Sequence, residues 1–432
     1  MERYSGYKDS GIQWIGEIPS HWEVEPFGRH FTFSKGLPIT KADLTSNGVA
    51  VISYGQIHSK SNKGFTLGKE LIRYVDEKYR ESNPKSLLNN NDFVFADTSE
   101  DIEGAGNFVF NDYNTIIFAG YHTVVARPKD LPFPKYYACL FCSIPWKSQI
   151  QSLVNGVKVY SINKGHLKKT FLILPPLSEQ ERIVKFLEGK VLKIDEYIAD
   201  KEREIQLLKE LKEAEIAKAV TQGLNPNVKM KDSKTSFFGL IPEHWSERKI
   251  KYCFCERSEK NHPNEPVLCA TQSQGVIPQS MYQNRVVVVN KGFEGLKFVK
   301  VGDFVISLRS FEGGIEYAYY QGIISAAYTI LTPIEKSNAD YFKLLFKCYP
   351  FIQVLQNCVT GIREGQNINY QMLGRKYIPL PPLGEQRAIV AHIETKCAKV
   401  DSLVTELEAE IEHLKEYKQR LIADCVTGQI KV

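Results

Sequence analysis

Two long stretches of the chain carry apolar residues at intervals of mostly three or four positions, with charged residues between them. The first extends from Leu177 to Gln222 and the second from Leu383 to Gly428, and neither contains a proline. A narrow apolar stripe on a charged surface is typical of a helix in a two-stranded coiled coil. At ~1.5 Å per residue, a helix of about 46 residues would be ~69 Å long. Such a helix needs a partner, and the other stretch is the obvious one.

The two stretches are copies of one sequence. LILPPLSEQERIV from Leu172 matches IPLPPLGEQRAIV from Ile378 at an offset of 206 residues, and further matches follow along both helices. The Pro-Pro pair suits a helix start, and Ser178 is the predicted N-cap of the first helix. A period of about half the chain indicates a tandem duplication. The alternative, two unrelated surface helices, does not explain the matched register.

Shorter apolar runs ahead of each helix predict β-strands, because they are rich in Val, Ile, Phe and Tyr and are bounded by Gly, Asn, Asp and Lys. The expected strands are 49–54, 93–96, 115–118 and 123–126 in the first unit, and 267–270, 286–289, 304–308 and 325–331 in the second. Short apolar helices are expected at 136–141 and 341–346. The sequence therefore predicts an α+β fold with globular units 1–175 and 225–380 and long helices 176–224 and 381–432.

The order of unit, helix, unit, helix restricts how the helices can pair. The linkers are short, so an antiparallel pair is expected, whereas a parallel pair would need a return path along a whole helix. A pseudo-twofold axis would then relate the two units. The opener GEIPSHW at Gly16–Trp22 recurs as GLIPEHW at Gly239–Trp245, directly after the first helix. We therefore expect the end of the second helix to lie close to the N-terminus.

Composition and charge narrow the class of protein. The N-terminus has no apolar segment of a secretory signal, and no run of about 18 apolar residues predicts a membrane span. The nine Cys residues form neither a disulfide nor a zinc pattern, so a cytoplasmic location is expected. The two helix stretches carry net charges of −2 and −3 in a chain of +5, which leaves +10 on the rest. Basic globular units suggest that the partner is a polyanion.

A search for catalytic motifs finds none. The chain lacks a phosphate-binding loop, the Asn-Pro-Pro-Tyr signature of adenine methyltransferases and a dinucleotide-binding glycine motif. His21 and His244 recur in the openers, where packing is a better interpretation than metal binding. The loop with Asp97, Glu100, Asp101 and Glu103 is interpreted as a solvated loop rather than as a metal nuclease site.

Two divergent units alternate with two near-identical long helices, each of which starts with PPL-x-EQ. This arrangement resembles the specificity subunits of type I restriction-modification enzymes. VGDFVISLRSFEGG from Val301 and TGIREGQNIN from Thr360 match that family, whereas NNDFVFADTSEDIEGAG in the first unit departs from it. The resemblance implies two target recognition domains that read the halves of a bipartite, asymmetric DNA site. It also implies that the helices act as a spacer and dock two methyltransferase subunits, which supply S-adenosylmethionine, while restriction subunits supply ATP-driven translocation and cleavage with Mg. This chain would bind no cofactor or metal and carry no active site.

Basic, amide and hydroxyl side chains on loops are the groups that contact bases and phosphates. On this basis the candidate DNA-binding residues are Tyr54, Gln56, His58, Lys60, Lys63, Lys158, Tyr160 and Asn163 in the first unit, and Thr271, Gln272, Gln274, Arg309, Ser310, Arg363, Gln366 and Asn367 in the second.

Two other functions stay open at this point. The chain could be a coiled-coil scaffold that joins two proteins without reading DNA, in which case its binding would lack the steep salt dependence of DNA contacts. It could also be a nuclease or methyltransferase, which would require activity in the isolated chain.

Overall fold

The computed structural model describes residues 2–154, 156, 159–282, 292–334, 338–361 and 367–432. The chain forms two compact units. Unit 1 comprises Met1–Lys201 and Ala409–Val432, and unit 2 comprises Glu202–Glu408. Two long helices, α7 (Leu177–Gln222) and α13 (Leu383–Val426), each contribute to both units.

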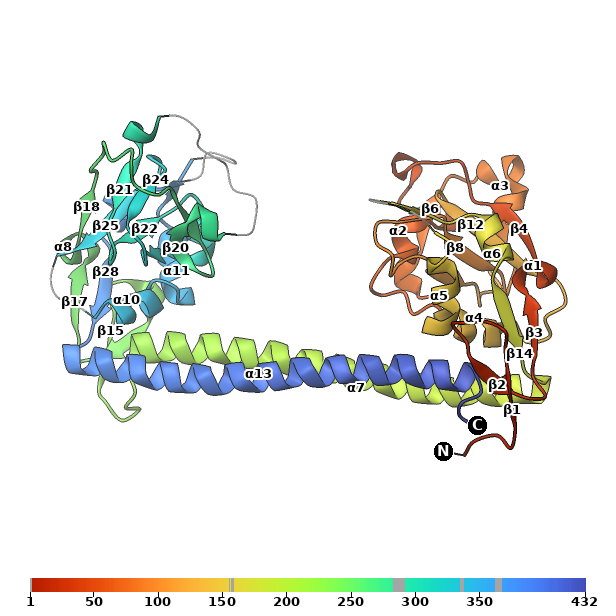
Figure 1. Cartoon of the computed structure of the whole chain (residues 1–432). Helices are drawn as coiled ribbons and strands as arrows, with labels where there is room; N and C mark the ends of the chain where they lie inside the picture. The colour runs from red at the N-terminus through yellow and green to blue at the C-terminus, as the bar shows by residue number, and fades with distance from the viewer. Residues whose placement is uncertain (1, 155, 157–158, 283–291, 335–337, 362–366) are drawn as a thin grey trace. The chain divides into compact units, whose positions relative to one another are not determined.

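Short helices surround the sheets of each unit (Figure 1). They are α1 Phe27–His30, α2 Tyr54–Ile57, α3 Tyr79–Ser82, α4 Pro134–Cys142, α5 Ile144–Gln151 and α6 Lys164–Lys168 in unit 1, and α8 Ile250–Cys253, α9 Ser310–Gly313, α10 Ala339–Leu345, α11 Tyr349–Gln356 and α12 Tyr370–Leu373 in unit 2.

In the part of unit 1 that the structure describes, there are an antiparallel sheet in the order β10–β8–β12–β4, a mixed sheet in the order β6–β5–β11–β7 and three two-stranded pairs. The strands are β1 Tyr7–Asp9, β2 Glu17–Pro19, β3 Glu23–Pro26, β4 Phe31–Lys35, β5 Val49–Ile52, β6 Arg73–Val75, β7 Leu87–Leu88, β8 Phe93–Ala96, β9 Thr98–Ser99, β10 Phe108–Phe110, β11 Ile117–Ala119, β12 Thr123–Pro128, β13 Tyr160–Ser161 and β14 Phe171–Leu174. Alternate Phe side chains of β8 and β10 pack against α4 and Trp146 of α5, so these helices cover one face of the antiparallel sheet.

The described residues of unit 2 form an antiparallel sheet in the order β18–β25–β22–β23 and five two-stranded pairs. The strands are β15 Met230–Asp232, β16 Leu240–Pro242, β17 Ser246–Lys249, β18 Phe254–Arg257, β19 Leu268–Thr271, β20 Gly275–Pro278, β21 Lys297–Val299, β22 Phe304–Ile306, β23 Glu316–Tyr317, β24 Gly322–Ile324, β25 Thr329–Pro333, β26 Val359–Thr360, β27 Asn367–Ile368 and β28 Tyr377–Leu380. Here Phe254 and Phe304 pack against Phe342 and Phe346 from α10 and the residue after it.

The long helices run antiparallel within each unit, as the order of elements predicts. In unit 1, Asp195 pairs with Lys418 at 2.6 Å and Lys201 with Glu410 at 3.2 Å. In unit 2, Lys209 pairs with Glu408 at 3.9 Å and Lys212 with Asp401 at 2.6 Å. In both units the residue number rises along α7 as it falls along α13.

The predicted closeness of the chain's two ends is confirmed in unit 1. The Tyr7 hydroxyl donates to the carbonyl of Gly428 at 3.0 Å, and the Gln429 amide donates to the carbonyl of Glu17 at 2.7 Å. Gly428 has a φ of +74°, and a Cβ on it would lie 2.4 Å from Pro19 and 3.0 Å from Trp22. Glycine at this position therefore ends α13 and lets it meet the opener.

Most predicted elements occur, with shifted ends. The strand predicted at 93–96 has these bounds in β8, and the helix predicted at 136–141 lies inside α4. The strand predicted at 286–289 lies outside the described residues. The N-cap prediction for Ser178 is wrong, because the Pro176 carbonyl accepts the amides of Glu179 and Gln180 at 2.8 and 3.0 Å. The helix thus begins at Leu177, one residue before Ser178.

Candidate nucleic-acid interface

The repeated helix start fastens the opener of each unit to a long helix. In unit 1, Glu179 accepts hydrogen bonds from Tyr4 at 2.7 Å, His21 at 2.8 Å and Trp22 at 3.0 Å. In unit 2, Glu385 contacts His244 at 2.9 Å. Both histidines thus hold structure together, as the sequence analysis preferred. Burial opposes ionisation of Glu179, but its three hydrogen-bond donors hold the pKa of this carboxyl below its usual value.

The glutamine of the same motif closes the turn ahead of each helix. The side-chain amides of Gln180 and Gln386 are buried, and each donates at 2.9 Å to the carbonyl of the proline five residues earlier. The Glu and Gln of PPL-x-EQ thus both make contacts that hold the start of the helix in place.

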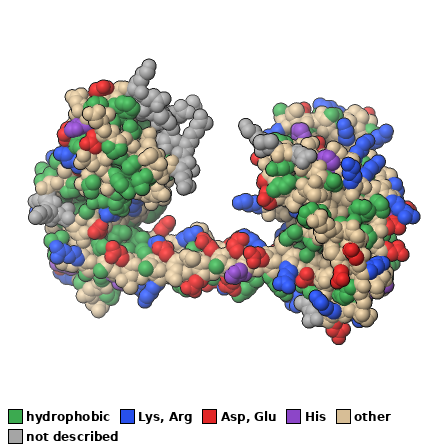
Figure 2. Space-filling model, viewed as in Figure 1, with side chains coloured by type: hydrophobic (Ala, Val, Ile, Leu, Met, Phe, Trp, Pro, Cys, Tyr) green, Lys and Arg blue, Asp and Glu red, His purple; other side chains and the backbone are tan. Residues whose placement is uncertain are grey.

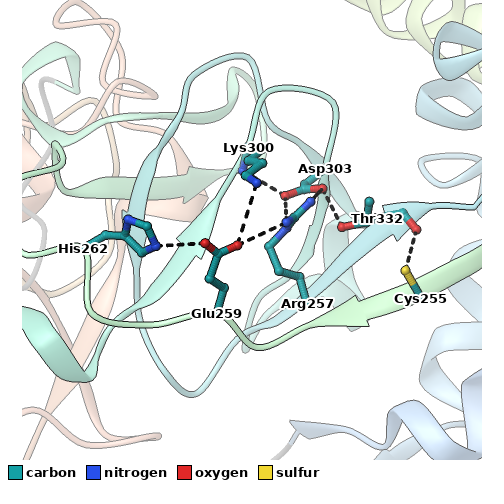
Figure 3. Close-up of polar contacts among 7 residues, drawn as sticks. All are labelled: Cys255, Arg257, Glu259, His262, Lys300, Asp303 and Thr332. Carbon is teal, nitrogen blue, oxygen red and sulfur yellow. Dashed lines mark hydrogen bonds and ion pairs between the residues drawn. The ribbon is translucent and has the colours of Figure 1, made fainter.

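A buried aspartate precedes the central strand of each antiparallel sheet. Asp92 accepts the backbone amide of Asn89, and Asp303 accepts that of Lys300, both at 2.8 Å. Each carboxylate also accepts a guanidinium N–H at 3.0 Å, from Arg127 on β12 in unit 1 and from Arg257 on β18 in unit 2 (Figure 3). Burial raises the pKa of Asp92, and the guanidinium opposes this shift. These turns fix the strands β8 and β22, which lead into the acidic loop of unit 1 and into the loop with Arg309 in unit 2.

In unit 2 the candidate residues from two loops line one hollow. Thr271 ends β19, Gln272 follows it in the turn to β20, and Arg309 comes from the loop after β22. Gln272 and Arg309 are exposed. An amide and a guanidinium that share a hollow are suited to reading adenine and guanine edges.

Two of the candidates, Thr271 and Ser310, use their hydroxyl groups in hydrogen bonds within the fold. Thr271 is buried and donates to the carbonyl of Gly275 at 2.9 Å, while it accepts the amide of Gln274 at 3.0 Å. The Ser310 hydroxyl is buried and accepts the amide of Ser307 at 2.8 Å. Gln274 itself is exposed in the turn. Asn367 is exposed on β27, outside this hollow, while Arg363 and Gln366 lie outside the described residues.

In unit 1 the corresponding region has an acidic lining. Tyr54 and His58 line a hollow with Glu100, Asp101 and Glu103, and the Tyr54 hydroxyl donates to Glu100 at 3.0 Å. Burial and the neighbouring carboxylate raise the pKa of Tyr54. Carboxylates repel phosphates but can accept the amino group of cytosine.

The other unit 1 candidates are dispersed. Gln56 and Asn163 cap the starts of α2 and α6, with Asn163 accepting the amides of Gly165 and His166. Lys63 forms an ion pair with Asp195 of α7 at 3.5 Å. Lys60 is exposed, Tyr160 pairs with Ser99 in the β13–β9 ladder, and Lys158 lies outside the described residues.

Three residues that the sequence analysis did not single out hold these loops. In unit 2 the Lys347 ammonium donates to the carbonyls of Gln272 and Gly313. In unit 1 the Lys147 ammonium donates to Asn107 at 2.7 Å, and Asn107 contacts His58 at 3.3 Å. Burial lowers the pKa of Lys147. No motif marks these lysines, because each one lies far along the chain from the loop that it holds.

Within the described ranges, no three His, Cys, Asp or Glu side chains come together in a way that could hold a metal ion. In the acidic loop of unit 1, Asp97 accepts from Thr98 at 2.7 Å and Asp101 accepts the amide of Gly104 at 2.6 Å. Among the helices that the structure describes, none has the length and apolarity to cross a membrane. Figure 2 shows both acidic and basic side chains on the visible face of the helix pair.

Comparison with known proteins gives consistent matches. Residues 19–207 match the model of the type I restriction modification DNA specificity domain. A putative specificity subunit of the type I restriction enzyme MjaX from Methanocaldococcus jannaschii is 25% identical, over 97% of this chain and 96% of its own length. The specificity subunit of EcoKI from Escherichia coli is 20% identical, over 96% of this chain and 90% of its own length.

A solved structure from work on complex assembly and conformational transition of the type I R-M system superposes with a TM-score of 0.66 at 18% identity. It covers 96% of this chain, and 99% of its own length is matched. This likeness concerns the fold alone.

Proposed function

The chain belongs to the type I restriction-modification specificity subunits, and from this premise we propose that it selects the DNA sequence at which such a complex acts. Each unit reads one half of a bipartite, asymmetric target. The chain itself is non-catalytic. Two modification subunits dock on it and transfer methyl groups from S-adenosylmethionine to adenine N6, and restriction subunits supply ATP- and Mg-dependent cleavage.

One observation carries the proposal: the two units share their framework contacts and differ at the loops. The paired contacts of His21 with Glu179 and of His244 with Glu385 are the same, whereas the hollow of unit 1 is acidic and that of unit 2 contains Arg309. A common framework with different loops is what two readers of different sequences need.

The helix pair acts as the spacer in this proposal. Because the helices are antiparallel in each unit, a pseudo-twofold axis would present the two readers to duplex DNA in inverted orientations. The distance between the half-sites then follows from the length of helix between the units.

Mapping of methylated adenines tests this function. Long-read sequencing of the host genome should show one bipartite methylated motif when the gene for this chain is present and none when it is deleted. Methylation that is unchanged by the deletion would contradict the proposal.

Binding measurements separate the proposal from the alternatives. DNA binding through several Lys and Arg contacts should weaken steeply with salt, by a slope of about −0.9 in log K against log salt for each phosphate contact. A scaffold without DNA readout would show no such slope. A nuclease or methyltransferase would be active as the isolated chain, whereas we expect activity only after the partner subunits are added.

A further inference from the structure

Lys347 lies where two loops of unit 2 meet. It follows Phe346, between α10 and α11, and its ammonium group reaches the carbonyls of Gln272 at 3.1 Å and Gly313 at 2.9 Å. It also contacts the carboxylate of Glu316 on β23. A lysine has three N–H donors, and these three acceptors satisfy all of them.

The loops packed against Lys347 leave little room for displacement. Gly314 has a φ of +84°, and a Cβ there would lie 2.2 Å from the Phe346 carbonyl. A Cβ on Gly313 would lie 2.8 Å from the side-chain amide of Gln272. The loop after β22 therefore passes directly over Phe346 and Lys347, and the side chain of Gln272 rests on it.

The contact of Lys347 with Glu316 is an ion pair, so it requires the positive charge of the ammonium group. Its side chain is 4% exposed, and that of Lys347 is 32% exposed. Removal of the ammonium would leave a nearly buried carboxylate and two carbonyl groups without this donor, and such groups would have to move to reach water.

We infer that Lys347 is a positioning residue that sets the distance between Gln272 and Arg309, the exposed polar side chains of the two loops. The inference rests on the proposed function and adds to it a residue of unit 2 that determines base preference without touching a base. Readout by two side chains requires their separation to match that of the base edges, within about 0.5 Å for a preorganised site.

Unit 1 holds its loops without a lysine at the corresponding position, so it serves as a matched comparison for unit 2. The residue in the place of Lys347 is Cys142, which also follows the last Phe of the helix and contacts the Lys63 carbonyl at 3.7 Å. Lys347→Met should therefore change the base preference in the half-site that unit 2 reads. The preference in the half-site that unit 1 reads should stay unchanged.

The test is selection from a pool of randomised duplexes by the complex of this chain with its modification subunits. The half-site that Arg309→Ala alters is the half read by unit 2. Lys347→Met should reduce discrimination in that half about tenfold, the size of a lost base contact, and leave the other half unchanged. The slope of affinity against salt should also stay unchanged, because a lysine that bound phosphate would reduce it by about 0.9.

Gly313→Ala tests the same inference without removing a charge. The three atoms nearest to its Cβ would all belong to the flexible side chain of Gln272, so preference should change in the same half while the melting temperature stays within about 1 °C. If Lys347→Met fails to fold, Lys347→Arg decides, because a guanidinium keeps the charge but cannot place a single nitrogen on all three acceptors. Lys229→Met is the control, since Lys229 pairs with Glu243 at 3.1 Å and is 80% exposed.

Unaltered preference in both variants would overturn the inference, and so would an equal loss in both halves or a reduced salt slope. A wild-type complex that selects no sequence would overturn the proposed function, and the inference with it. Wild-type selection with unaffected variants would overturn the inference alone.

Discussion

Units 1 and 2 use one framework to support two different loop surfaces. Each has a glutamate that binds the opener, a buried tyrosine on the helix after the sheet and a buried aspartate before the central strand. Unit 1 reads Ala-Asp-Thr-Ser from Ala96, the last residue of β8, and unit 2 reads Ser-Leu-Arg-Ser from Ser307, directly after β22. Only the final serine, Ser99 or Ser310, is buried in both. The framework positions are thus held by packing, while exposed positions of the segment are free to diverge.

The two units also differ within the framework, in the strand that supplies the arginine to the buried aspartate. Phe31 on β4 and Phe254 on β18 lie opposite Pro128 and Pro333, so these strands correspond. Unit 1 has Ser34 and Arg127 at the two positions where unit 2 has Arg257 and Thr332. The guanidinium reaches the corresponding carboxylate from β12, next to β8, in unit 1 and from β18, one strand further from β22, in unit 2.

The largest effect is expected when this pair is broken. Arg257→Ala leaves Asp303, 2% exposed, without its guanidinium, and the loss of one partner of a buried pair costs about 3–5 kcal/mol. Hydrogen exchange should show reduced protection in unit 2 and unchanged protection in the sheet of unit 1.

The exchanged variant sharpens the comparison. Arg257→Ser combined with Thr332→Arg places the guanidinium as unit 1 has it, and should recover most of the lost stability. If hydrogen exchange in unit 2 is no better protected than in Arg257→Ala, an arginine on β25 cannot replace the arginine on β18.

The next effect concerns the divergent loops. Arg309 in unit 2 corresponds to Thr98 in unit 1, whose hydroxyl already donates to Asp97 at 2.7 Å. Arg309→Ala should cost about 1–3 kcal/mol of discrimination at one base pair, whereas Thr98→Ala should have a much smaller effect. Competition binding with single-base variants of the target measures both, and equal losses would contradict the assignment of Arg309.

The fastening of the openers is expected to differ in strength. Glu179 accepts from Tyr4, His21 and Trp22, whereas Trp245 Nε1, in the place of Trp22, is buried and has no hydrogen-bond partner among the described residues. Because hydrogen bonds to a charged group contribute about 1.5–3 kcal/mol, Glu179→Gln should destabilise unit 1 more than Glu385→Gln destabilises unit 2. Denaturant unfolding of both variants gives the comparison.

The pH dependence of Glu179→Gln has a definite sign. The folded pKa of Glu179 is lowered from the ordinary value of 4.5, so its stabilisation is present above pH 4.5 and is lost as the pH falls through the folded pKa. The difference in unfolding free energy between wild type and Glu179→Gln should therefore be constant near pH 7 and shrink in acid. A difference that grows in acid would exclude the carboxylate as the cause.

The framework was more predictable from the sequence than the candidate site. Periodicity and the repeat placed both long helices, because a long apolar stripe has few ways to be buried. Their antiparallel direction followed from the order of units and helices and from the short linkers. Local candidates such as Ser310 and Asn163 were chosen for their side-chain chemistry, but their polar atoms hold turns and caps. The role of Lys347 depends on contacts with residues 34 and 75 positions away, which no local pattern encodes.

The smallest effect is expected from one hydrogen bond that both units share. Its removal tests whether the corresponding framework contacts of units 1 and 2 contribute equal free energy. The Tyr136 hydroxyl donates to the Val426 carbonyl at 3.1 Å in unit 1, and the Tyr341 hydroxyl donates to the Val220 carbonyl at 2.9 Å in unit 2. Both tyrosines are buried, so each Tyr→Phe change should cost about 1 kcal/mol, the net contribution of one hydrogen bond.

Tyr74→Phe is a suitable control for these two variants, because Tyr74 is 39% exposed. The loss of this exposed hydroxyl should leave the free energy of unfolding within about 0.5 kcal/mol of the wild-type value. Hydrogen exchange at the ends of α7 and α13 measures the two framework bonds separately. Equal losses would mean that divergence of the loops has left the helix contacts energetically equivalent, whereas a loss confined to one unit would mean that the duplicated framework has itself begun to specialise.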